Sequence, residues 1–88
     1  MEIQWDAVAW ENYDTAEADP PLATAYDDTL DNLISDPQPV SVRLNRLSEV
    51  DAWLTYVRVR GREQKYAIIW RVSPPGTLQV LHLGPWGL

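Results

Sequence analysis

The sequence contains no cysteine and no phenylalanine, and His82 is its only histidine. Without cysteine there is no disulfide, no thiolate metal site and no thiol nucleophile. One histidine cannot build a histidine-rich metal cluster, and neither a glycine-rich phosphate loop nor a Ser/His/Asp order is present. We therefore expect no cofactor and no metal, although carboxylate sites for hard cations stay formally open.

Basic residues are absent from the first forty positions, which hold ten acidic residues. All seven basic residues lie between Arg43 and Arg71, among only three acidic ones. The first forty residues therefore carry a formal charge of −10 and the remaining residues one of +4, which together give the net charge of −6. Association with nucleic acid depends on where cations cluster rather than on the net charge. An acidic protein of this kind can thus still present a basic face.

No apolar run approaches the roughly eighteen residues that span a bilayer. The first residues also lack the basic start and apolar run of a signal peptide. We therefore expect a cytoplasmic protein with no membrane contact. Its 88 residues predict a single domain over 1–88.

The first half of the chain predicts one short strand and two helices. Ile3 and Trp5 alternate with polar residues, as in a strand with one buried face. A helix follows over 7–18, and Asp19 can cap a second helix whose first residue is Pro20. The apolar stripe of this second helix follows the three-four spacing of Leu22, Ala25, Tyr26, Thr29, Leu30, Leu33 and Ile34. On its opposite side, a solvated face is favoured over a metal cluster for Asp27, Asp28 and Asp31.

The second half predicts a sheet, because β-branched and aromatic residues dominate it. We expect strands over 40–47, 52–60, 64–72 and 77–83, with turns over 60–63 and 73–76. The 52–60 run should place apolar side chains on one face and cations on the other, the second face carrying Leu54, Tyr56, Arg58 and Arg60. The fold class is α+β in the order β-α-α-β-β-β, with a meander of three or four strands and two helices packed on one face of an antiparallel-rich sheet.

The predicted hairpin gathers most of the basic residues. Arg58 and Arg60 share a strand face, so their guanidinium groups would stand about 7 Å apart, close to the spacing of successive phosphates. Arg62 and Lys65 extend the row through the turn, and Tyr56 offers a ring for base stacking. Further RNA contacts are expected from Arg43, Arg46 and Arg71. The alternative is that these cations only solvate the sheet and pair with acids of the helices.

Three segments of the predicted sheet, 56–61, 66–72 and 80–84, read Tyr-Val-Arg-Val-Arg-Gly, Tyr-Ala-Ile-Ile-Trp-Arg-Val and Val-Leu-His-Leu-Gly. They resemble the closing sheet of the RelE/ParE toxin superfamily. The helix end at 33–37, Leu-Ile-Ser-Asp-Pro, is similar to the end of that family's second helix. The resemblance extends over nearly the whole chain and implies the family's fold.

The resemblance also implies a metal-independent, ribosome-dependent endoribonuclease in which Arg58 and Arg60 hold the phosphate. Ala67 stands where the family has an arginine, so Lys65 is expected to substitute for it, with His82 as the acid or base. The family's end-of-strand arginine falls near Trp86, and its C-terminal tyrosine has no counterpart here. These departures leave two alternatives, a non-enzymatic ParE-like inhibitor of DNA gyrase and a degenerate member that only binds its partner. A cognate antitoxin is the expected partner in each case.

Overall fold

Helices and strands follow one another along the chain largely as the sequence predicts. The protein is represented by a computed structural model that describes residues 2–35, 45–47, 52–73 and 76–86. In chain order the elements are β1 (Glu2–Trp5), α1 (Ala7–Thr15), the 3₁₀ turn η1 (Ala16–Ala18), α2 (Pro20–Ser35), β2 (Asn45–Leu47), β3 (Ala52–Val57), β4 (Tyr66–Ser73) and β5 (Thr77–Pro85). The predicted α+β fold class is confirmed, and the short β2 lies within the strand predicted over 40–47.

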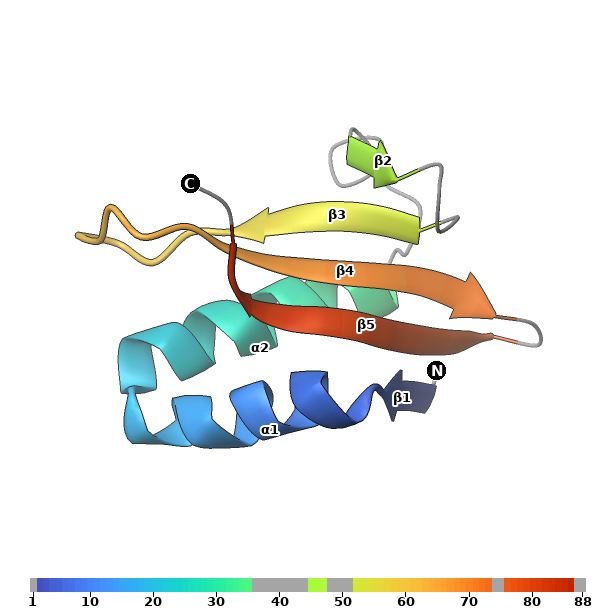
Figure 1. The fold of residues 1–88 in the computed structure, drawn as a ribbon, viewed down its shortest axis with the longest axis horizontal. Coiled ribbons are helices and arrows are strands. Elements are labelled where there is room, and N and C mark those ends of the chain that lie inside the picture. Colours follow the sequence, from blue (N-terminus) through green and yellow to red (C-terminus); the bar gives the residue numbers. More distant parts are fainter. Residues whose placement is uncertain (1, 36–44, 48–51, 74–75, 87–88) are drawn as a thin grey trace.

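The strands form a single five-stranded sheet in the order β1-β5-β4-β3-β2. The four later strands are antiparallel neighbours, whereas β1 pairs with β5 in parallel, with Glu2 opposite Thr77 and Trp5 opposite Val80. Both helices lie on one side of this sheet, as Figure 1 shows. Neither described helix has the length and apolar character needed to span a membrane.

The two helices begin at the residues that the sequence marks for them. The Asp6 carboxylate accepts a hydrogen bond from the Val8 amide at 3.2 Å and so caps α1. The second helix begins at Pro20, where the missing amide proton costs no helical hydrogen bond. Between them the predicted 7–18 helix tightens into the 3₁₀ turn η1, and the Asp19 amide donates to the Ala16 carbonyl at 2.9 Å.

The main core lies between α2 and the facing side of the sheet. The helix contributes the predicted stripe, of which Tyr26, Leu30 and Leu33 are fully buried. They share a cluster with Val59 of the β3–β4 connection and with the sheet residues Val57, Tyr66, Ile68, Trp70, Leu78, Val80 and Leu83. The buried Trp70 indole donates to the Thr55 hydroxyl at 2.8 Å, which satisfies its one polar group inside the core.

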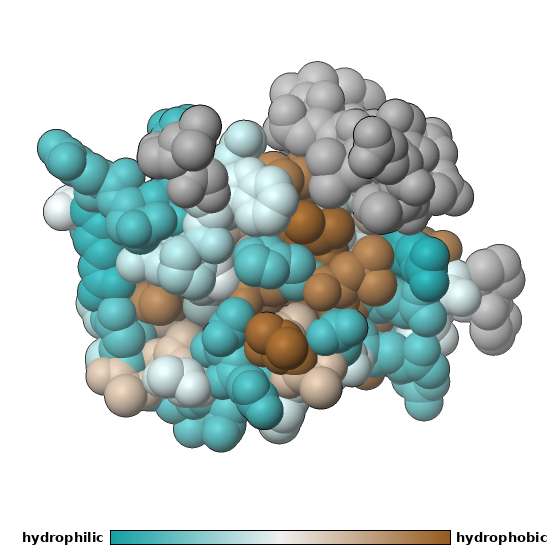
Figure 2. Space-filling model, viewed as in Figure 1, coloured by the Kyte–Doolittle hydropathy of each residue, from teal (hydrophilic) through white to brown (hydrophobic). Residues whose placement is uncertain are grey.

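The opposite side of the sheet differs from the prediction. It was expected to carry a row of cations along the strands, but its middle is an apolar cluster of Ala52, Leu54, Ala67 and Ile69, with Leu81 and Trp86 packed against it. Figure 2 shows hydrophobic surface gathered over the middle of the sheet and hydrophilic surface at the end where β3 and β4 join. Of the basic residues, Arg58, Arg60, Arg62 and Lys65 therefore gather at this end of the sheet rather than across its face.

Strand β3 ends at Val57, three residues before the predicted end at Arg60, and β4 begins at Tyr66 rather than Gln64. Because Val57 pairs with Tyr66, residues 58–65 form a long connection outside the sheet. Gly61 turns this connection at a positive φ of 81°, which a residue without a Cβ adopts readily. Of the predicted strand over 40–47, only 45–47 lies in the described residues.

Candidate functional site: the basic groove at the hairpin end

The connection between β3 and β4 encloses an open groove of about 470 Å³. It is lined by Arg58, Val59, Arg60, Arg62, Glu63, Gln64 and Lys65. We call it the hairpin groove. Arg58 and Arg60 are exposed there, in the irregular segment beyond β3 rather than on the strand itself. Within the described residues, neither guanidinium is held in an ion pair.

A smaller hollow of about 110 Å³ adjoins the hairpin groove through Arg58 and Lys65, which line both. Tyr56 and Val57 complete its wall. The Tyr56 side chain is 45% exposed although it belongs to a strand, so its ring is available at the surface. The structure thus brings together the predicted stacking ring and two of the predicted cations.

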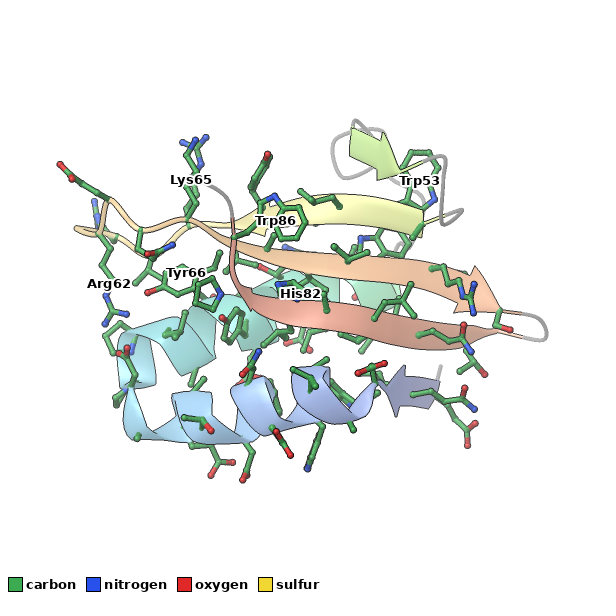
Figure 3. The ribbon with its side chains drawn as sticks, in the orientation of Figure 1. Trp53, Arg62, Lys65, Tyr66, His82 and Trp86 are labelled. Atoms are coloured by element: carbon green, nitrogen blue, oxygen red, sulfur yellow. The ribbon has the colours of Figure 1, made fainter. Side chains whose placement is uncertain are left out.

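Arg62 is held by an acidic partner from the helix layer. Its two terminal nitrogens meet the two carboxylate oxygens of Asp19 at 2.6 and 2.7 Å, and Nη1 also lies 3.4 Å from the Tyr66 hydroxyl. Hydrogen bonds from Arg62 hold the pKa of the Asp19 carboxyl below its usual value. Figure 3 shows Arg62 pointing toward the helices and Lys65 pointing to the other side of the hairpin. Arg62 therefore serves the fold, and its charge is largely compensated.

Lys65 stands where the C-terminal segment joins the hairpin. Its backbone carbonyl accepts hydrogen bonds from the Trp86 amide at 2.9 Å and from the Gln64 side chain at 2.8 Å. These bonds fix the backbone at the base of the groove, whereas the Lys65 side chain stays exposed. The Lys65 ammonium group can therefore change position within the groove while the Lys65 backbone stays fixed.

His82 lies on the outer face of the sheet, which the strand periodicity did not predict. Simple alternation would place it beside Val80 toward the helices, but a register shift between Ile69 and Trp70 leaves Leu81 as an extra residue. His82 then pairs with Ile69 of the outer cluster, and its ring meets the Trp86 ring at 5.4 Å between centroids. Its Nε2 is buried and has no hydrogen-bond partner among the described residues. His82 does not line the hairpin groove.

The remaining predicted RNA contacts do not gather at the groove in the described structure. Arg71 is exposed near the far end of β4, where its Nε donates to the Gln79 side chain at 2.5 Å. Arg46 belongs to β2, with no description of its side chain, and Arg43 lies outside the described residues. Among the described residues, no group of three or more His, Cys, Asp or Glu side chains is placed to hold a metal ion.

Glu63 is the residue of the groove that sequence reasoning missed. It lines the groove together with Arg58, Arg60 and Lys65. A signal was present, because Glu63 is the only acidic residue after Asp51 and it stands inside the basic run. The groove thus combines several cationic side chains with one carboxyl group.

Comparisons with known proteins bear on the fold. No protein-family model matches the sequence, and a comparison with curated protein sequences finds no match. Among solved structures, the chain is similar to the "YoeB/ParE toxin from Agrobacterium tumefaciens", with a TM-score of 0.77 and 18% identity over 99% of this chain and 100% of that one. The chain therefore has the fold of the RelE/ParE toxin superfamily, as its sequence resemblance predicts.

Proposed function

We propose that this chain is a toxin of the RelE/ParE kind that acts on messenger RNA at the ribosome through the hairpin groove. The observation that carries the proposal is the open groove of about 470 Å³ whose lining includes Arg58, Arg60 and Lys65 together with Glu63. Clustered cations bind the phosphate backbone of RNA, and an adjacent exposed ring such as Tyr56 suits an unpaired base. An antitoxin partner and a cytoplasmic location belong to this proposal.

The groove supplies the groups that metal-independent RNA cleavage needs. In the proposed reaction a ribose 2′-oxygen attacks phosphorus, Glu63 accepts the proton of the 2′-hydroxyl, and the bond to the 5′-oxygen breaks. Arg58 and Arg60 stabilise the charge that develops on the phosphoryl oxygens. Lys65 gives a proton to the departing 5′-oxygen, since an ammonium releases a proton far more readily than a guanidinium. The products are a cyclic phosphate and a 5′-hydroxyl.

The test replaces Arg58 and Arg60 together with Ala and measures binding of single-stranded RNA and of ribosomes across a salt series. We expect weaker binding and a slope of log affinity against log salt that is smaller by about 2, one for each lost phosphate contact. Arg71→Ala removes the same type of charge from the far end of β4 and is the matched control. An unchanged salt slope in the double variant would refute RNA binding by the groove.

A second candidate is non-enzymatic inhibition through a protein target, such as the DNA gyrase of ParE-like proteins. The placement of His82 favours it, because the only histidine of the sequence lies outside the hairpin groove and its Nε2 is buried. Induced expression separates the two candidates. New RNA ends within coding sequences support cleavage, whereas growth arrest with double-strand DNA breaks and intact messages supports the gyrase alternative.

A further inference from the structure

Three aromatic rings form a cluster on β1 and α1. Trp5 meets Trp10 and Tyr13 at centroid distances of 5.4 and 4.8 Å, and Trp10 and Tyr13 are 5.8 Å apart. Trp10 nevertheless remains 49% exposed. We call Trp10 and Tyr13, with Trp5, the α1 aromatic face. A half-exposed indole supported by two further rings offers a large, rigid apolar contact surface.

Carboxylates surround this face. Asp6 and Asp14 lie four residues before and after Trp10, so they flank it along one side of α1. At the other edge, the Tyr13 hydroxyl donates to the Asp27 carboxylate of α2 at 2.5 Å.

Acidic residues of η1 and α2 act on the Tyr13 hydroxyl. The hydrogen bond to Asp27, partial burial and the charges of Asp27, Glu17 and Asp31 raise the pKa of Tyr13 to about 12. No basic residue occurs before Arg43, and of the later ones Arg71 lines a hollow with Trp5 and Asp6 at the β1 end of this face.

The charge and the rings together select one kind of occupant. The acidic surroundings repel RNA phosphates and anionic lipid headgroups, which excludes both from this face. A guanidinium group, in contrast, can make two favourable interactions here, because it stacks on an indole face and forms paired hydrogen bonds with a carboxylate. Trp10 with Asp14 and Asp6 offers both interactions within two helical turns.

We propose that the α1 aromatic face binds an arginine-rich segment of a partner protein, with apolar side chains of that segment packing on Trp10. The charge around this face is opposite in sign to that of the hairpin groove, which is cationic. This inference does not depend on the proposed function, since it uses none of the groove residues. Each can fail while the other holds.

The test uses the full chain and a fluorescent amphipathic peptide that carries Arg and Leu at helical spacing, with binding followed by anisotropy. We expect saturable binding that weakens about tenfold in Trp10→Ala, the loss typical of a central aromatic contact. Asp14→Asn should weaken it severalfold and reduce its salt dependence. A peptide with every Arg replaced by Glu should not bind.

Two matched controls remove equivalent groups elsewhere. Val72→Ala shortens an exposed apolar side chain on β4, and Asp28→Asn removes the same charge from an exposed position of α2. Both should leave the peptide affinity unchanged. Thermal unfolding of each variant shows that the comparison is between folded proteins.

The proposal is overturned if Trp10→Ala binds the Arg peptide as the unaltered chain does, or if Asp28→Asn weakens it as much as Asp14→Asn. The second result would mean attraction by net charge alone. Sedimentation of the unaltered chain supplies a further criterion. Self-association that Trp10→Ala abolishes would show that a second copy, through its cationic hairpin, occupies the face instead.

Discussion

Arg62 and Asp19 form a two-pronged ion pair, Nη2 to Oδ1 at 2.6 Å and Nη1 to Oδ2 at 2.7 Å, that ties the β3–β4 connection to the start of α2. Their side chains are 32% and 36% exposed, so the pair is partly shielded from water. Paired geometry of this kind restricts both partners more than a single contact does. The hairpin groove is therefore anchored to the helix layer on one side, and through the Trp86 amide to the C-terminal segment on the other.

The first prediction concerns the fall in the free energy of unfolding at acid pH. Arg62 lowers the pKa of Asp19 in the folded protein. The stabilisation by the ion pair is therefore fully present above the unfolded-state pKa of Asp19. This stabilisation disappears as the pH falls through the lowered folded-state pKa. Asp19→Asn should reduce the free energy of unfolding at neutral pH and flatten its fall in acid. Urea unfolding at a series of pH values measures this, with Glu63→Gln as a control. Equal acid slopes in Asp19→Asn and the unaltered chain would contradict the prediction.

The second prediction concerns the buried hydrogen bond between Trp70 and Thr55. Thr55→Val keeps the shape of the side chain but removes the hydroxyl that accepts from the indole at 2.8 Å. A buried donor deprived of its partner costs about 1–3 kcal/mol, which should appear as a lower unfolding free energy. Thr24→Val makes the same substitution at an exposed position of α2 and should change stability far less. A loss no larger than that of the control would show that the indole finds another acceptor.

A third prediction links Gly84 with Asn12. The Asn12 amide donates to the Leu83 carbonyl at 2.9 Å, and a Cβ on Gly84 would stand 2.9 Å from the same amide nitrogen. Gly84 also has φ of 157°, which a side chain tolerates poorly. Gly84→Ala should thus destabilise the protein by about 1–3 kcal/mol.

Part of that loss should disappear in the Asn12→Ala background, where the contact is already absent. A double-mutant cycle measures the coupling between the two sites. Strict additivity would mean that backbone strain at Gly84 accounts for the whole effect.

The fourth prediction separates binding from chemistry in the hairpin groove. If Glu63 accepts the 2′-hydroxyl proton, Glu63→Gln should lower the rate of messenger cleavage on ribosomes by about a hundredfold or more. Its RNA affinity should be unchanged or higher, because a negative charge leaves a cationic groove. Arg58→Ala should instead reduce affinity as well as rate. Cleavage by Glu63→Gln at the rate of the unaltered chain would show that Glu63 takes no part in the proposed reaction.

The N-terminal half shows how far local sequence determines structure. Asp6 and the Asp19-Pro20 step mark helix starts through bonds made within a few residues, and the three-four spacing of the α2 stripe follows from helical geometry. The antiparallel meander of β3, β4 and β5 follows similarly from alternating runs between turns. For these reasons the fold class and most of the elements were predictable.

The candidate site was only partly predictable. Its cations were visible in the sequence, but β3 ends at Val57, so Arg58 and Arg60 lie in a groove and not along a basic sheet face. Arg62 was expected to meet RNA, although the structure places it on Asp19, 43 residues away in sequence. The place of Glu63 in the groove was hidden from sequence reasoning because a lone exposed carboxylate has no periodic pattern.

The amino-acid sequence alone determined the helix starts, the strand runs and the separation of acidic and basic segments, because hydrophobic spacing, capping and covalent order act over a few residues. Only the tertiary structure decided which charges meet, on which face His82 emerges, and where the groove opens. Those outcomes depend on contacts between distant segments and on the single extra residue at Leu81, which reverses the alternation of β5. Local sequence patterns specify neither the contacts between distant segments nor the position of the extra residue.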